Sequence, residues 1–212
     1  MPTETFFNLA KEKKNKVIEI SITLFAERGY TKTQITEIVK KADIAKGSFY
    51  QYFDDKSDLY KYILNKAIKV KEEYIKKELK KLEEERNFFR YWEGLNKANI
   101  NFALENINLA RVLRDVYKMG KNELFEAIEK DYEKQGIDLI KKWLIIAIKN
   151  NEIKSNINIK YTAHLLYTAN CFIIDYLLED EEIDSQNKIY PYANKIVEII
   201  RNGLKNSRKK EG

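Results

Sequence analysis

The sequence has few of the residues that turns, sheets and disulfide-linked scaffolds require. Its 212 residues include only 7 glycines, 2 prolines and a single cysteine, Cys171. So little glycine and proline removes the turn signals of an all-β chain, and one cysteine cannot form a disulfide within the chain. We therefore expect an all-α protein. The lone cysteine and the lack of an apolar N-terminal signal segment favour a cytoplasmic location.

Long apolar runs are also lacking. The most apolar stretch, WLIIAI at residues 143–148, is far shorter than the roughly 20 residues of a membrane-spanning helix. Hydrophobic residues still make up 44% of the chain and aromatic residues 12%, enough to bury a core. The sequence predicts a soluble protein with no membrane partner.

Enzyme signatures are missing as well. The chain has one histidine, His164, and no GxGxxG, Walker loop, HExxH or nucleophile-elbow pattern. We expect no enzyme, no catalytic or metal-binding residues and no cofactor. The net charge of +6 suits a partner that carries phosphates. However, residues 1–60 contain 10 Lys/Arg against 9 Asp/Glu, so the excess is not concentrated there.

Apolar residues at helical spacing predict a helix-turn-helix near the N-terminus. One stripe ends at Gly29, and a second runs over residues 35–42 with Thr33 as its N-cap. Residues 43–45 form a short turn before a helix at 46–52. A long helix then begins after Asp55. Its apolar positions are Leu59, Ile63, Ala67, Val70 and Tyr74.

The rest of the chain continues in helices, about nine in all. Loops are expected at residues 150–160 and 179–187, on either side of a helix at 161–178. Apolar residues cover more than half of the circumference of that helix, so it must be buried on two sides, one of them against a partner subunit. The last helix, 189–204, carries a similar stripe at Ile196, Val197 and Ile200. We expect a homodimer formed through helices 161–178 and 189–204.

The N-terminal motifs resemble those of the tetracycline-repressor (TetR) family of bacterial transcription regulators. The similarity rests on LFAERGY at 24–30, Thr33, ITEIVKKA at 35–42, KGSFYQYF at 46–53, and Lys56 followed by Leu59. It covers roughly the first 60 residues. It implies a three-helix DNA-binding domain at residues 1–55 and a larger helical domain for ligand binding and dimerisation at 56–212. The implied function is a ligand-responsive repressor that binds a near-palindromic double-stranded DNA operator.

The resemblance also implies individual roles. Phe49 and Phe53 would pack inside, whereas two tyrosines would point to DNA phosphates and Thr33 and Lys56 would hold phosphates at helix starts. Other side chains would reach base edges, and a glycine would allow close approach. The expected DNA contacts are Thr33, Gln34, Lys46, Gly47, Ser48, Tyr50, Gln51, Tyr52 and Lys56.

Two positions depart from the family pattern. Asp43 stands where the turn usually has glycine, and Ala45 stands where a serine or threonine usually caps the next helix. Aspartate tolerates a left-handed backbone better than most residues. We therefore expect the fold to be kept.

The C-terminal part has more aromatic residues than a minimal helical core requires, and several are expected to line a cavity for a small apolar or amphiphilic effector. Asn170 is also expected there, because its amide falls among apolar neighbours and needs a buried partner. The expected ligand-binding residues are Trp92, Phe102, Phe125, Trp143, Tyr167 and Asn170. Two alternatives remain open: a helical protein-interaction module, and a DNA-binding regulator that responds to no ligand.

Overall fold

The protein is built from α-helices, as the sequence predicted. A computed structural model describes residues 2–82, 87–118, 123–180 and 185–205. The described residues form ten helices where about nine were expected. They gather in two compact units, one made of residues 1–70 and 106–129 and the other of residues 71–105 and 130–212. The predicted boundary between a DNA-binding domain at residues 1–55 and a ligand-binding and dimerisation domain at residues 56–212 stays a prediction.

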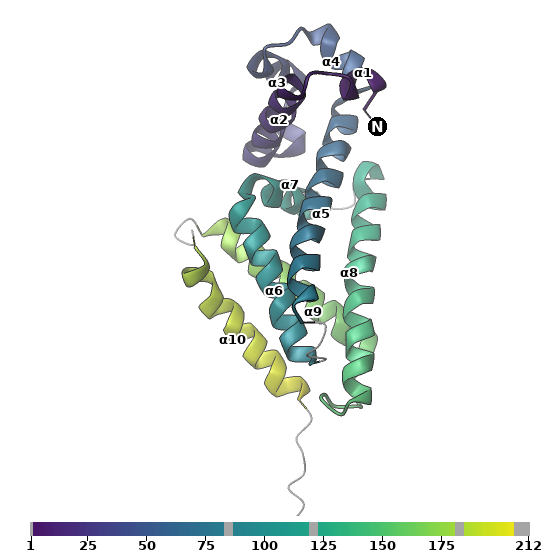
Figure 1. The fold of residues 1–212 in the computed structure, drawn as a ribbon, viewed down its shortest axis with the longest axis vertical. Coiled ribbons are helices and arrows are strands. Elements are labelled where there is room, and N and C mark those ends of the chain that lie inside the picture. The colour runs from purple at the N-terminus through teal and green to yellow at the C-terminus, as the bar shows by residue number, and fades with distance from the viewer. Residues whose placement is uncertain (1, 83–86, 119–122, 181–184, 206–212) are drawn as a thin grey trace, which may run out of the picture. The chain divides into compact units, whose positions relative to one another are not determined.

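The first unit contains the helix-turn-helix (Figure 1). Three of its helices are α2 (Lys11–Lys32), α3 (Ile35–Ala42) and α4 (Lys46–Tyr52). The three residues between α3 and α4 are the predicted turn. The unit also holds α1 (Glu4–Phe7), the first part of α5 (Lys56–Lys80), and α7 (Ile107–Lys118). The short helix α1 was not predicted, because four residues are too few to show a helical period.

Aromatic side chains form much of the core of this unit. Phe49 and Phe53 are fully buried, as expected, with ring centroids 5.6 Å apart. Phe6 of α1 is fully buried too, and its ring lies 4.8 Å from that of Phe53. Phe25 of α2 meets Tyr60 of α5 edge to face at 4.8 Å. Such pairs add stabilisation beyond the area they bury, and they join α1, α2, α4 and α5.

A carboxylate on α7 holds two other helices of the unit. Asp115 Oδ2 accepts hydrogen bonds from the Tyr30 backbone N–H at 2.8 Å and from the Tyr60 hydroxyl at 3.0 Å. Burial, together with the Asp115 charge, raises the pKa of Tyr60, so its hydroxyl stays protonated and can donate. Just before Tyr30, Gly29 leaves the helical conformation, with φ 74° and ψ 169°. This combination is favourable only for glycine.

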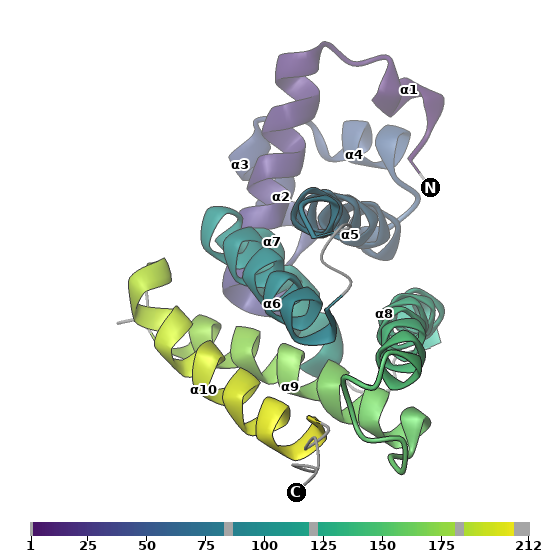
Figure 2. The ribbon, with the colours of Figure 1, turned by 60° about the horizontal axis from the view of Figure 1, so that its bottom comes forward.

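The second unit is a helical bundle in which α9 and α10 lie beside α6 (Figure 2). It contains the end of α5, α6 (Phe88–Glu105), most of α8 (Glu123–Lys149), α9 (Ile159–Glu179) and α10 (Gln186–Leu204). Its buried core includes Phe88, Trp92, Leu95, Ile140, Leu144, Leu166 and Val197. Within the described ranges, no helix has the length and apolar character needed to cross a bilayer.

Replacing Gly29 with alanine should lower the free energy of unfolding by about 3 kcal/mol, because the backbone there has a positive φ and the new Cβ would lie 2.8 Å from Asp115 Oδ1. Urea unfolding followed by circular dichroism measures the change. The matched control is Gly47→Ala, where a Cβ meets nothing within 4 Å and alanine should stabilise the helix by up to about 1 kcal/mol. Equal stabilities for the two variants would contradict the strain at Gly29.

Candidate DNA-binding surface and ligand cavity

Helix α4 buries one face and exposes the other. Phe49 packs fully into the core, whereas Lys46, Gly47 and Gln51 are exposed and Tyr50 is 49% exposed. The exposed face contains a cation, an amide and a phenol hydroxyl, which are groups that donate to phosphates and base edges. No side chain atom lies within 4 Å of the Cβ position at Gly47, so another backbone can approach there.

The structure overturns the expected orientation of Tyr52. Its side chain is only 3% exposed, and its ring packs against Phe6 with centroids 6.2 Å apart. Tyr52 follows Phe49 by three residues, and residues at this spacing share one face of a helix. It therefore belongs to the buried face, and only Tyr50 points outward.

Thr33 is also placed differently from the expectation. It is fully buried, and its hydroxyl lies 2.8 Å from the carbonyl oxygen of Gly29 and 3.2 Å from that of Leu24, to which it donates. The N-cap of α3 is Gln34, which makes no side-chain capping bond. Thr33 thus closes the end of α2 instead of capping α3. Its hydroxyl is occupied within the protein.

Lys56, the other expected phosphate ligand, points into the protein. Its ammonium donates to the carbonyl oxygens of Tyr30 at 2.8 Å and Thr33 at 2.9 Å. It also lies 4.4 Å from the centre of the Tyr30 ring, a cation–π contact. Partial burial lowers the pKa of this ammonium. Lys56 therefore ties the start of α5 to the last turn of α2 and to its C-cap, Thr33.

The turn of the helix-turn-helix confirms the expectation for Asp43. This residue is the C-cap of α3 in the left-handed conformation, with φ 58° and ψ 51°. The following helix has Ala45 as its N-cap, without a side-chain capping bond. The two departures from the family pattern leave the turn intact.

A support for α4 was missed in the sequence. Thr3, which precedes α1, donates from its backbone N–H to the Tyr52 carbonyl oxygen at 3.0 Å and from its hydroxyl to the Gln51 carbonyl oxygen at 2.6 Å. The last carbonyls of a helix have no partner within the helix. Thr3 satisfies two of them and so fixes the end of α4. A cap made by a residue so distant in the sequence has no short sequence pattern. A related local signal is the apolar FF pair at 6–7, which is consistent with the burial of Phe6.

The second unit contains an apolar cavity of about 450 Å³. Helices α5, α6, α8 and α9 line it, and its apolar wall includes Ile75, Leu79, Leu95, Leu139 and Ile140. Two of the predicted ligand-binding residues, Tyr167 and Asn170, lie on its wall. Cavities of this size and character are typical of small-molecule sites.

Three buried asparagines form a hydrogen-bonded chain beside this cavity. Asn170 Nδ2 donates to Asn96 Oδ1 at 2.8 Å, and Asn99 Nδ2 donates to Asn170 Oδ1 at 3.0 Å. Asn99 and Asn170 line the cavity. The expectation that the Asn170 amide has a buried partner is confirmed. The sequence did not identify Asn96 and Asn99, although their spacing of three residues places both on one face of α6.

The other predicted aromatics do not line this cavity. Trp92 and Phe102 are core residues with exposures of 1% and 2%. Trp143 stacks on Tyr91, with ring centroids 3.9 Å apart. Trp92, Phe102 and Trp143 fill space between helices. The prediction that these three residues line a ligand cavity is therefore wrong for this cavity. The side chain of Phe125 lies outside the described part of the chain.

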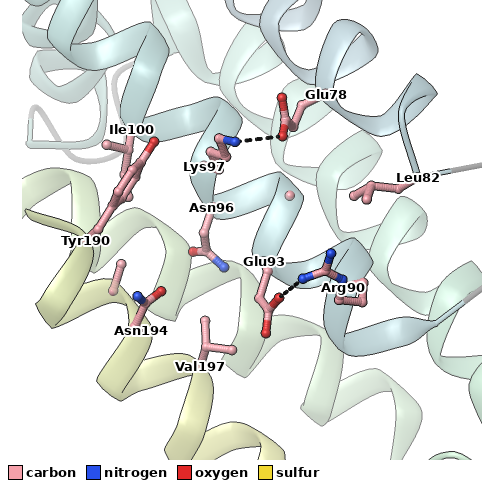
Figure 3. A pocket seen from close by; sticks show the side chains of 12 residues that line it. Glu78, Leu82, Arg90, Glu93, Asn96, Lys97, Ile100, Tyr190, Asn194 and Val197 are labelled. Atoms are coloured by element: carbon pink, nitrogen blue, oxygen red, sulfur yellow. Dashed lines mark hydrogen bonds and ion pairs between the residues drawn. The ribbon is translucent and has the colours of Figure 1, made fainter. Parts of the chain in front are cut away.

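A second, smaller pocket of about 220 Å³ lies beside α6 and α10 (Figure 3). Its charged side chains pair with one another: Lys97 lies 3.4 Å from Glu78, and Arg90 lies 3.5 Å from Glu93. Arg201 of α10 also pairs with Glu93. These charges are compensated within the protein, and the apolar cavity is therefore the better candidate for a ligand. Among the described residues, no cluster of three or more His, Cys, Asp or Glu side chains is arranged to hold a metal.

The helix-turn-helix matches a known family. Residues 17–63 match the family described as "Bacterial regulatory proteins, tetR family". The first curated relative, the uncharacterized HTH-type transcriptional regulator YuxN of Bacillus subtilis, is 46% identical over 55 residues, 26% of this chain. This chain spans only 19% of that protein. The fatty acid metabolism regulator protein of Bacillus subtilis is 23% identical over 204 residues, 92% of this chain and 99% of that protein.

Solved structures share the whole fold. A TetR family transcriptional regulator from Chloroflexus aurantiacus is 25% identical, with a TM-score of 0.75 over 98% of this chain and 100% of that one. FadR from Bacillus subtilis in complex with stearoyl-CoA is 18% identical, with a TM-score of 0.72 over 89% of this chain and 98% of that one. The helix-turn-helix motif, the family match over residues 17–63 and the shared fold agree with one another and support a transcriptional regulator of the TetR family. The proteins that the chain resembles are transcriptional regulators and not enzymes.

Proposed function

We propose that the protein is a repressor that binds a near-palindromic DNA operator as a homodimer and is released by a small apolar or amphiphilic effector. The observation that carries the proposal is the exposed face of α4. Phe49, Tyr52 and the hydrogen bond from Thr3 anchor the helix. Its polar, cationic face is exposed, and nothing lies within 4 Å of the Cβ position at Gly47. A rigid helix of this kind is suited to the major groove.

The proposed DNA contacts are residues that the fold leaves exposed, together with the half-buried Ser48. Lys46, Ser48 and Gln51 are assigned to base edges together with Gln34, and Tyr50 is assigned to a phosphate. Gly47 allows close approach of the DNA backbone. Thr33, Tyr52 and Lys56 are left out of this set, since the first two are buried and the ammonium of the third bonds to backbone carbonyls.

The proposed dimer surface is an apolar stripe on α9 and α10. Tyr161 is 71% exposed, Leu165 65% and Phe172 60%, and Ile199 of α10 is 71% exposed. The stripe expected on α10 is partly corrected, because Val197 is buried and Ile200 packs against the core of its own unit. Apolar side chains this exposed mark a site for a partner. A second copy of the chain would also supply the helix-turn-helix that binds the second half of a palindromic operator.

The apolar cavity is the proposed effector site. The similarity to a regulator named for fatty acid metabolism and the fold shared with a protein crystallised with stearoyl-CoA both favour an acyl or alkyl ligand. The five aliphatic side chains of the wall support the same class. Release of DNA requires that the ligand binds more tightly to the state that does not fit the operator.

The proposal is tested by fluorescence anisotropy with a duplex from the region upstream of the chain's own coding sequence. Binding should be tighter than to a scrambled duplex by at least about 1,000-fold. A decanol or acyl-CoA titration should then lower the affinity. Equal affinity for both duplexes, measured across several upstream fragments, would contradict operator recognition.

The exposed lysine of α4 should contribute to sequence preference. Lys46→Ala is expected to reduce the ratio of operator to scrambled affinity about ten-fold, because one base-edge contact is lost. The matched control is Lys142→Ala, which removes the same charge from an exposed position on α8. An unchanged ratio in the Lys46 variant would remove this residue from the contact set.

Lys56 should behave as a structural residue. Lys56→Met leaves two backbone carbonyls without their donor, so the free energy of unfolding should fall by about 1 kcal/mol. The slope of log affinity against log salt should stay the same. A slope lowered by about one unit, with stability unchanged, would instead restore Lys56 as a phosphate ligand.

The exposed stripe should form the dimer. Phe172→Glu places a charge in the proposed interface and should weaken self-association at least about ten-fold, with loss of operator binding. Sedimentation velocity over a concentration series measures this. Ile145→Glu is the control, since Ile145 is an exposed residue of α8, 42% accessible and outside the stripe. A Phe172 variant that stays dimeric would place the interface elsewhere.

A further inference from the structure

The lining of the apolar cavity changes from buried to solvent-exposed residues. Leu95 and Ile140 are buried, whereas Lys71 is half-buried and Lys76 and Gln135 are exposed. We call these last three residues the mouth of the cavity. An amphiphile fits such a site in one orientation, with its apolar part in the buried region and its polar part at the mouth, where water still reaches it.

The buried amides beside the cavity are occupied with one another. Each amide nitrogen of Asn96, Asn99 and Asn170 donates to a backbone carbonyl or to a neighbouring amide oxygen. Asn99 Oδ1 has no partner, but protein atoms enclose it and a group in the cavity does not reach it. An ionised group placed there would lose its water without a charge to compensate it. A charged part of a ligand therefore belongs at the mouth.

One positive charge at the mouth is not compensated. The charged residues of the lining are Lys71, Glu72 and Lys76. Lys76 Nζ lies 3.4 Å from Glu72 Oε2, so these two charges balance each other. Lys71 forms no ion pair with a carboxylate of the described residues, and its ammonium lies 5.3 Å from the centre of the Tyr132 ring, which lines the cavity as well. The lining thus has one more positive charge than negative, and that charge is at Lys71.

Lys71 also stands at one end of the aliphatic wall. Lys71, Ile75 and Leu79 follow one another at intervals of four residues and share one face of α5. The rise from the first to the last is about 12 Å. An extended alkyl chain that starts at the Lys71 ammonium can therefore lie along this face.

Two carboxylates lie in the neighbourhood of Lys71 without lining the cavity. Burial raises the pKa of the Cys171 thiol on α9, and the charge of Lys71 lowers it. Asp175 and Glu133 raise the same pKa, so they also lie near this thiol, but neither belongs to the cavity lining. The Coulomb energy falls with distance and salt screens exposed charges. An anion in contact with Lys71 therefore gains more than these two carboxylates oppose.

We infer that the cavity binds an amphiphile with an anionic headgroup, a carboxylate or a phosphate, and that Lys71 holds this headgroup at the mouth while the alkyl chain lies along Ile75, Leu79 and Leu139. The inference rests on the proposed effector site and specifies its ligand class and orientation. A neutral headgroup would gain nothing from the Lys71 charge. A cationic headgroup would be repelled by it.

Four probes of equal chain length test this inference: decanoate, decyl phosphate, 1-decanol and decyltrimethylammonium. Binding is measured by isothermal titration calorimetry on the full chain without DNA. At least one anion should bind about five- to ten-fold more tightly than decanol, between the values for exposed ion pairs and for buried charge-assisted bonds. The cation should bind most weakly. The tighter of the two anions distinguishes a fatty acid from a phosphorylated lipid. Decanol or the cation binding as tightly as both anions, or binding of none of the four, would overturn the inference.

Three variants identify the cation. Lys71→Met removes the charge and keeps an unbranched side chain, so the preference for the anion over decanol should fall to about one. Lys71→Arg keeps the charge and should keep the preference. The matched control is Lys80→Met, which removes the same charge from an exposed position of α5 outside the cavity lining. A preference that survives in Lys71→Met, or that falls equally in Lys80→Met, would overturn the role of Lys71.

A salt series on the unmodified chain provides a readout that needs no variant. Higher ionic strength should weaken binding of the anion and leave the affinity for decanol unchanged or higher, because only the anion pairs with a partly exposed charge. An anion affinity that does not respond to salt would contradict the pairing with Lys71.

The result is separable from the proposed function. An anion that binds with the expected preference but leaves operator affinity unchanged would support the ligand class and contradict release by an effector. Operator binding that decanol weakens, with no preference for either anion, would support release by an effector and contradict the ligand class.

Discussion

The bonds to the Asp115 carboxylate organise the unit that carries the helix-turn-helix. Through one oxygen, α7 holds the end of α2 at the Tyr30 amide and the early part of α5 at the Tyr60 hydroxyl. The approach is possible because Gly29 has no side chain at the point of contact. Lys56 then closes the same region, donating to the carbonyls of Tyr30 and Thr33. The Asp115 carboxylate on α7 and the Lys56 ammonium on α5 thus bond to backbone polar groups where α2 ends.

The exposed face of α4 depends on the bonds of Asp115 and Lys56 and on a second set of contacts, at the C-terminal end of α4. Thr3 satisfies the carbonyls of Gln51 and Tyr52, and Phe6 packs on the Phe53 ring. A seven-residue helix is too short to be stable by itself. Its shape comes from the tertiary contacts of its buried face, and the residues free for a partner are those that these contacts do not use.

The second unit combines an apolar cavity with a polar chain of three amides. Buried amides are costly unless their bonds are completed. Two backbone carbonyls and the amides themselves give each of these amide nitrogens and oxygens at least one partner, except the oxygen of Asn99. The aliphatic wall of the cavity suits an apolar ligand. The charged side chains of the smaller pocket are instead paired with one another (Figure 3).

The sequence by itself determined most of the helices and the turn at residues 43–45 through local periodicity, and the need of Asn170 for a partner through side-chain chemistry. The burial of Phe49 and Phe53 and the tolerance of the turn for Asp43 were expected from the family resemblance. Only the tertiary structure decided that Tyr52 is buried, that Lys56 bonds to carbonyls, and that Trp92 fills the core instead of a cavity. It also placed α7 with the helix-turn-helix. Periodicity shows which face of a helix is apolar, but the partner of that face lies far away in the sequence. Whether an ammonium meets a phosphate or a carbonyl, and whether a ring fills or lines a space, depends on distances between elements that no local pattern contains.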